Sequence, residues 1–143
     1  MSLNDDERFA APPPNRSALE VTDVLRFSVC CPRRNIAMML VDGEIDLRTA
    51  PSFRDQLCRV FGAGPVMIVL DLSPVTFLAA AGLRVLVDAQ TQAEKSRRRM
   101  VLITEARCVD RALEVTGLAP SFHRVRSLDA ALADAAVGYE ETA

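Results

Sequence analysis

The sequence of 143 residues has no tryptophan, a single tyrosine and a single histidine. Because so few large aromatic rings are present, the chain has little on which nucleotide bases stack. The net charge is -2, from 17 basic and 19 acidic residues, and gives no overall attraction to nucleic acid or to an anionic membrane. No stretch approaches the roughly 20 apolar residues of a membrane helix. We therefore expect neither a direct nucleic-acid partner nor a membrane span.

Residues suited to catalysis or metal binding are equally scarce. The single His123 lies in a predicted strand, a setting typical of a surface or structural histidine. No Cys-x-x-Cys pair occurs, and His123 stands beside no cysteine, so neither zinc nor a disulfide framework is indicated. The acidic N-terminus lacks the basic-then-apolar layout of a signal peptide. We expect reduced thiols, no metal, no cofactor, no enzymatic activity and a cytoplasmic location.

The four cysteines are Cys30, Cys31, Cys58 and Cys108. Each is interpreted first as a small buried apolar side chain. Cys30 and Cys31 are neighbours on a predicted strand, so one of them is expected to face the core. Cys108 is the candidate for redox reactivity, because it is predicted just before or within the first turn of a helix, where the helix dipole lowers a thiol pKa.

Length and composition predict one globular domain, with half of the residues hydrophobic and a quarter charged. Residues 1–20 are polar and acidic, then rich in proline, and are expected to form a flexible tail. The domain is expected to span residues 21–137, followed by a short C-terminal tail at 138–143.

The domain is organised around residues 65–86. The apolar run from Val66 to Leu72 is preceded by Gly64-Pro65 and followed by Ser73-Pro74. It predicts a strand buried on both faces, as in a parallel sheet. A loop follows, with Val75 and Phe77 at strand spacing. Residues 79–83 then lead into a helix whose first turn offers free N–H groups and partial positive charge.

Strands and helices alternate along the rest of the chain. Residues 25–31 and 35–41 predict a hairpin with its turn at 32–34, and residues 100–104 and 123–125 predict two further strands. Thr49 and Ser127 are predicted helix N-caps. Four helices are expected, at 50–61, from 83 to the basic run 95–99, at 109–116 and at 127–136. The inward faces expected for them are Ala50, Phe53, Leu57, Val60 and Phe61; Leu83, Leu86, Val87, Gln90 and Ala93; Val109, Ala112, Leu113 and Thr116; and Leu128, Ala131, Leu132 and Ala135. The predicted fold is α/β, a small mixed sheet flanked by about four helices.

Four segments carry a resemblance to a known family. They read Gly-Glu-Ile-Asp at 43–46, Val-Leu-Asp-Leu-Ser-Pro-Val-Thr-Phe-Leu at 69–78, Gly-Leu at 82–83 and Val-Thr-Gly-Leu at 115–118. Together they resemble the STAS domain, and more narrowly the bacterial anti-sigma factor antagonists. The resemblance covers about residues 21–136 and implies the same order of elements.

The resemblance also implies a regulatory loop, normally Asp-Ser-Ser/Thr-Gly-Leu, in which an anti-sigma factor with kinase activity phosphorylates the first hydroxyl. At the matching positions this chain has Ala79, Ala80 and Ala81, and keeps only Gly82 and Leu83. An alanine has no nucleophilic oxygen, so Ala80 cannot be a phosphosite. The implied function is a non-enzymatic antagonist that binds an anti-sigma factor and releases a sigma factor, without this phosphorylation switch.

The predicted partner surface combines two loops. Because parallel strands deliver their C-terminal ends to one edge of a sheet, the loop after the second strand is expected beside the start of the helix after residue 78. The residues assigned to this surface are Asp46, Leu47, Ala79, Ala80, Ala81, Gly82, Leu83 and Arg84. The alternative function is a ligand-binding or scaffold STAS domain that serves a nucleotide, a lipid-transport complex or a signalling assembly.

Overall fold

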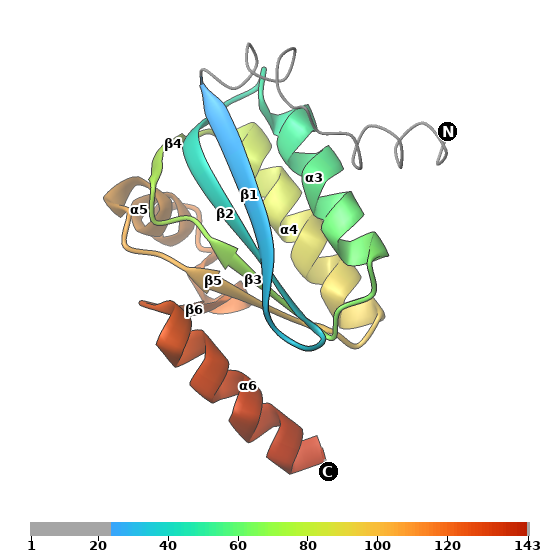
Figure 1. The fold of residues 1–143 in the computed structure, drawn as a ribbon. Helices are drawn as coiled ribbons and strands as arrows, with labels where there is room; N and C mark the ends of the chain where they lie inside the picture. The colour runs from blue at the N-terminus through green and yellow to red at the C-terminus, as the bar shows by residue number, and fades with distance from the viewer. Residues whose placement is uncertain (1–23, 143) are drawn as a thin grey trace.

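The structure, a computed structural model, describes residues 24–142, which form a six-stranded mixed sheet with helices on both faces (Figure 1). The tail predicted at residues 1–20 lies outside the described residues. The strands are β1 (Leu25–Arg33), β2 (Ile36–Ile45), β3 (Met67–Asp71), β4 (Val75–Leu78), β5 (Arg99–Ile103) and β6 (His123–Val125). The helices are α3 (Ala50–Gly62), α4 (Ala80–Lys95), α5 (Arg107–Val115) and α6 (Leu128–Thr142), with one 3₁₀ turn at Ala119–Ser121.

The sheet follows the order β1-β2-β3-β5-β6, and β4 pairs with the end of β2. β1 and β2 form the predicted antiparallel hairpin, while the pairs β2–β3, β3–β5 and β5–β6 are parallel. The hairpin turn lies at Arg34–Asn35 instead of residues 32–34, because Asn35 adopts the positive φ of 65° that a tight turn requires. The α/β prediction with a mixed sheet and four helices is confirmed.

Strand β2 extends beyond the range predicted for it, residues 35–41, and continues through Gly43. Gly43 has a φ of 124°, and a Cβ there would lie 1.9 Å from the carbonyl oxygen of Val24. Only glycine allows this close approach of β1 to β2. β2 therefore reaches Ile45, which brings its end beside β4.

Strand β4 was predicted as a loop. It pairs in parallel with β2, and its register slips by one residue, since Gly43 lies opposite Val75 and Glu44 lies opposite Phe77. The extra residue, Thr76, is a β-bulge, and a bulge reverses the inward and outward alternation of the residues that follow it. Val75 is consequently buried, while Thr76 and Phe77 are exposed.

Helices cover the two faces of the sheet separately. α3, α4 and α5 pack on one face around the larger core, and α6 packs on the other face through Ala131 and Ala135. Every residue predicted to face inward on α3 is buried, and the ring of Phe27 on β1 stacks on that of Phe53 at 6.4 Å. Within residues 24–142, no helix is both long and apolar enough to cross a membrane.

The predicted face of α4 is correct for Leu83, Leu86 and Ala93, but Val87 and Gln90 are only partly buried. Val85 and Ala89 take the inward positions in their place. The buried side of α4 is therefore shifted toward Val85 and Ala89. The reason is that α4 packs against α3 as well as against the sheet, so that two neighbours decide which of its residues are buried.

The shorter helices also depart from the predictions in detail. On α5, Val109 and Leu113 are buried, whereas Thr116 lies beyond the last helical residue and is exposed. The hydroxyl of Ser127 caps α6 as predicted, accepting a bond from the N–H of Ala130 at 3.1 Å. α6 then runs to Thr142, past the predicted end at residue 136 and into the segment expected to be a tail.

Candidate functional site

The structure brings together the two segments predicted to form one surface. Ile45, the last residue of β2, lies opposite Leu78 of β4, and the N–H of Ala79 donates to the carbonyl oxygen of Ile45 at 2.9 Å. The loop that leaves β2 and the start of α4 therefore lie side by side at one edge of the sheet. We call this edge, with residues 46–48, 76–77, 79–81 and 84, the loop surface.

The loop after β2 is held by Asp46 and Thr49. The carboxylate of Asp46 accepts bonds from the N–H groups of Arg48 and Thr49, each at 2.9 Å, and the Thr49 hydroxyl donates to the carbonyl oxygen of Glu44 at 2.9 Å. The hydrogen bond from the Thr49 N–H is the main reason that the pKa of Asp46 lies below its usual value. The polar groups thus satisfy one another, and Leu47, at 80% exposure, projects into solvent.

Thr49 precedes α3 at the predicted N-cap position, but its side chain does not cap the helix. Its hydroxyl instead joins the Asp46 network, accepting from the Asp46 N–H at 2.9 Å. The expected cap is therefore replaced by a bond that fixes the loop itself.

The start of α4 is small and uncharged. Ala79 is the N-cap, with φ -90° and ψ 172°, and provides no side-chain hydrogen bond. Ala80, the first helical residue, is exposed, and Ala81 is partly buried. The alanines therefore leave the first turn of the helix without a hydroxyl or a carboxylate.

Gly82 and Leu83 are buried and contribute packing rather than contact area to the predicted surface. A Cβ on Gly82 would lie 2.5 Å from Cγ2 of Ile45 and 2.6 Å from Cδ1 of Leu78. The glycine thus allows the first turn of α4 to pack directly on the ends of β2 and β4. We assign Gly82 and Leu83 a positioning role.

Arg84 lies at the rim of the loop surface, where it joins an ion-pair chain. Its Nε is 3.4 Å from one carboxylate oxygen of Asp88, and Nη2 of Arg54 on α3 is 2.9 Å from the other. The side chain of Arg84 is 75% exposed. The chain of charges links the start of α4 to α3.

Phe77 belongs to the loop surface, although the residues predicted for that surface do not include it. It is 49% exposed and, with Leu47, adds a large apolar side chain to an otherwise small surface. The Thr76 hydroxyl donates to the carbonyl oxygen of Gly43 at 3.3 Å and so supports the bulge. Val75 and Phe77 are at strand spacing in the sequence, but no feature of the residues marks the bulge that leaves Phe77 exposed.

The cysteines lie differently from the predictions. All four are free, and Cys30, Cys31 and Cys58 are exposed, so the expectation that one of Cys30 and Cys31 faces the core is wrong. β1 is an edge strand of the sheet, and both faces of its residues 28–31 are open to solvent.

Cys108 does lie in the first turn of α5, as predicted, but its pKa is raised, not lowered. Partial burial is the main cause and outweighs the backbone N–H groups at the helix start, which act in the opposite direction. The thiol donates to the carbonyl oxygen of Val75 at 3.3 Å. Protonated and tied to β4, Cys108 has a structural role in these contacts.

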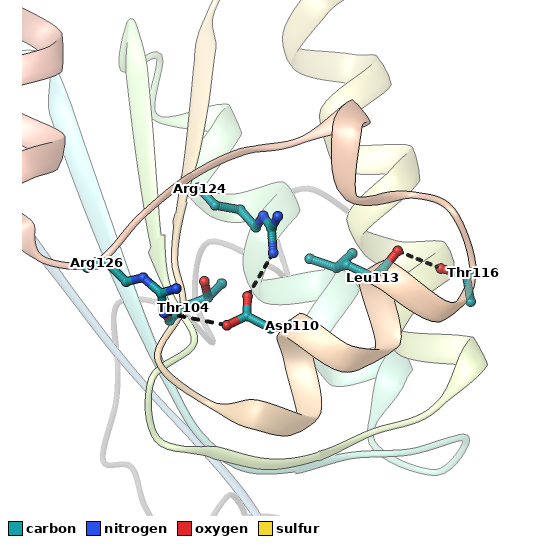
Figure 2. A network of polar contacts seen from close by, with 6 residues as sticks. All are labelled: Thr104, Asp110, Leu113, Thr116, Arg124 and Arg126. Carbon is teal, nitrogen blue, oxygen red and sulfur yellow. Dashed lines mark hydrogen bonds and ion pairs between the residues drawn. The ribbon is translucent and has the colours of Figure 1, made fainter.

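A second polar feature lies where β5 and β6 end (Figure 2). Asp110 on α5 accepts a bond from Nη1 of Arg124 at 2.9 Å and lies 3.7 Å from Nη1 of Arg126, which also donates to the carbonyl oxygen of Thr104 at 3.3 Å. Beside it is a pocket of about 350 Å³ that also includes Glu114. Because the two arginines share Asp110, this network ties α5 to β6. Among the described residues, no three His, Cys, Asp or Glu side chains gather as metal ligands do.

Comparisons with known proteins agree with one another. The model of the STAS domain family matches residues 32–135. The anti-sigma-F factor antagonist RsfB of Mycobacterium tuberculosis is 30% identical over 97 residues, covering 68% of this chain and 79% of RsfB. The crystal structure of an anti-sigma factor antagonist from Mycobacterium paratuberculosis superposes with a TM-score of 0.72 at 28% identity, covering 79% of this chain and 95% of that one. The anti-sigma factor antagonist SpoIIAA in its unphosphorylated form shares the fold, with a TM-score of 0.65 at 18% identity over 79% of this chain and 97% of that one.

Proposed function

Since this chain belongs to the STAS domain family and has anti-sigma factor antagonists as its relatives, we propose that it binds an anti-sigma factor and thereby releases a sigma factor. The observation that carries the proposal is the loop surface. It stands at the segment where the family motif lies, and its central residue, Ala80, is exposed, small and uncharged.

The composition of the loop surface suits a protein partner. Leu47 and Phe77 offer large exposed apolar side chains, and burying them against a partner is favourable because it removes apolar surface from water. Ala80, which is small and exposed, allows close approach of the partner backbone. Arg84 provides charge at the rim, where interfaces are typically polar.

The same surface supports an antagonist that lacks the loop phosphorylation switch. A phosphate adds about -1.5 to -2 charges and would oppose a contact made for a neutral loop. Ala79, Ala80 and Ala81 provide no oxygen to accept it. We infer that the loop stays in the state that binds, whether or not the anti-sigma factor is a kinase.

A displacement experiment tests this function. Purified complexes of sigma and anti-sigma factors from the same organism are mixed with increasing amounts of the protein, and free sigma factor is separated by size-exclusion chromatography. We expect release of sigma factor from at least one complex and a new complex of this chain with the anti-sigma factor. Failure to bind any anti-sigma factor would contradict the proposal.

A matched pair of variants shows whether the loop surface carries the binding. Leu47 and Val115 are apolar and similarly exposed, at 80% and 72%, but Val115 ends α5 outside the loop surface. Leu47→Asp should abolish displacement, because it places an unpaired charge in the contact. Val115→Asp should leave displacement unchanged. Equal behaviour of the two variants would place the interface elsewhere.

A further inference from the structure

An open groove of about 420 Å³ lies between α3 and α4. Its apolar lining comes from side chains that are almost fully buried, namely Leu57 and Phe61 of α3 and Val85 and Ala89 of α4. We call it the α3–α4 groove. Apolar surface in a concave site of this size is the usual setting for an anchoring side chain of a partner.

The groove is open because small residues line it where larger ones would close it. Cys58 is exposed on its wall, and a Cβ on Gly62 would meet no atom within 4 Å. Ala89 adds a third small side chain opposite them. Among the described residues, none fills this space.

Its charged residues favour an acidic partner. Arg54 and Arg98 line the groove together with one acidic residue, Asp88. Arg98 is held in place, since Nη1 donates to the carbonyl oxygen of Phe61 at 2.6 Å and its guanidinium lies over the Phe61 ring at 5.5 Å. Asp88 already contacts both Arg54 and Arg84, so positive charge is in excess along the groove.

The groove is continuous with the loop surface. Ala80, Arg84 and Asp88 are four residues apart on α4, and residues at this spacing lie on one face of a helix. At 1.5 Å per residue, the distance from Ala80 to Asp88 along the axis is about 12 Å. A partner helix of about two turns therefore covers both sites at once.

We propose that the α3–α4 groove receives an apolar side chain from an acidic helix of the same anti-sigma factor that contacts Ala80. The inference depends on the proposed function and extends it, because it gives the partner a second point of contact and a defined chemistry. Binding of an amphipathic helix in an apolar groove, with charged residues at the rim, is a common mode of peptide recognition.

The cysteines of the wild-type protein offer a direct test. Cys58 lines the groove, whereas Cys30 and Cys31 are exposed on β1 and outside it. Alkylation by iodoacetamide is followed by peptide mass mapping, with and without the anti-sigma factor that binds in the displacement experiment. We expect Cys58 to react several-fold more slowly in the complex and the two cysteines of β1 to react at unchanged rates. An unchanged rate at Cys58 would contradict the proposal.

The same substitution inside and outside the groove tests the energetic contribution. Cys58→Trp fills the groove and should weaken binding about 10-fold or more, while Cys30→Trp at an exposed cysteine of β1 should change affinity less than about 2-fold. Circular dichroism and thermal unfolding show that both variants are folded. Equal affinity of the two variants would overturn the proposal.

The outcomes separate this inference from the function on which it depends. If no anti-sigma factor binds the wild-type protein, both fail. If binding is lost in Ala80→Asp but is insensitive to Cys58→Trp, the loop surface stands and the groove proposal alone fails. If Cys58 becomes protected in the protein alone as its concentration rises, with dimers in sedimentation, a second copy occupies the groove and the proposal is overturned.

Discussion

Replacement of Gly82 by alanine tests how the structure positions the loop surface. The new Cβ would lie 2.5 Å from Cγ2 of Ile45 and 2.6 Å from Cδ1 of Leu78, whereas carbon atoms in contact prefer about 3.5–4.0 Å. Ile45 is fully buried and Leu78 is 8% exposed, so neither side chain has free space to move into. Overpacking of this kind costs about 1–3 kcal/mol, and the higher helix propensity of alanine offsets about 1 kcal/mol of it. We expect Gly82→Ala to lower the free energy of unfolding by about 1 kcal/mol.

Gly62→Ala is the matched control, because a Cβ at the end of α3 would meet no atom within 4 Å. Helix propensity then acts alone and should raise the free energy of unfolding by about 0.5 kcal/mol. Urea unfolding followed by circular dichroism measures both values, and the melting temperature should shift in opposite directions by about 2–5 °C. If Gly82→Ala stabilises the protein as Gly62→Ala does, α4 does not pack on the ends of β2 and β4 as described.

Three further predictions concern the loop surface and the thiols. Ala79 has the backbone angles of an N-cap but no capping side chain, so Ala79→Asp should stabilise the protein by about 1 kcal/mol in urea unfolding, and no gain would contradict the assigned start of α4. Intact-mass analysis after incubation with an anti-sigma kinase and ATP should show no phosphate on the wild-type loop and phosphate on the double variant Ala79→Asp, Ala80→Ser; a phosphorylated wild-type loop peptide would refute this. Cys108, whose pKa is raised by burial, should react with iodoacetamide more slowly than Cys30, and equal rates for the two thiols would refute this prediction. The contribution of Cys108 to stability should be lost as the pH rises above 9.0, because the unfolded chain releases the thiol proton before the folded chain does.

Regular patterns made much of the fold predictable from the sequence. The apolar residues of α3 recur with the helical period, so Phe53 and Leu57 are buried as predicted. The strand β3 is bounded by proline and glycine and is buried on both faces, which makes its apolar run unambiguous. These elements depend on local periodicity alone.

The features that were mispredicted depend on contacts between distant segments. Residues 75–78 form a strand instead of the predicted loop because they pair with the end of β2, and the pairing partner of a strand cannot be derived from that strand's own residues. The raised pKa of Cys108 comes from its burial against β4, which opposes the effect of its helix. The candidate site is likewise only partly local. The alanines at 79–81 are evident in the sequence, but the burial of Gly82 and the place of the α3–α4 groove follow from packing.

The measurement that bears most directly on the central claim is the affinity of Ala80→Asp for the anti-sigma factor, determined by titration calorimetry beside wild type and Ala80→Ser. An acidic residue in the first turn of α4 favours the helix, so the variant should stay folded. At the desolvated contact its unpaired charge should cost a few kcal/mol, equivalent to a loss of affinity of about 100-fold or more, while Ala80→Ser should bind nearly as wild type does. Equal affinity of Ala80→Asp and wild type, with the fold intact, would contradict the claim that this neutral loop surface binds the anti-sigma factor.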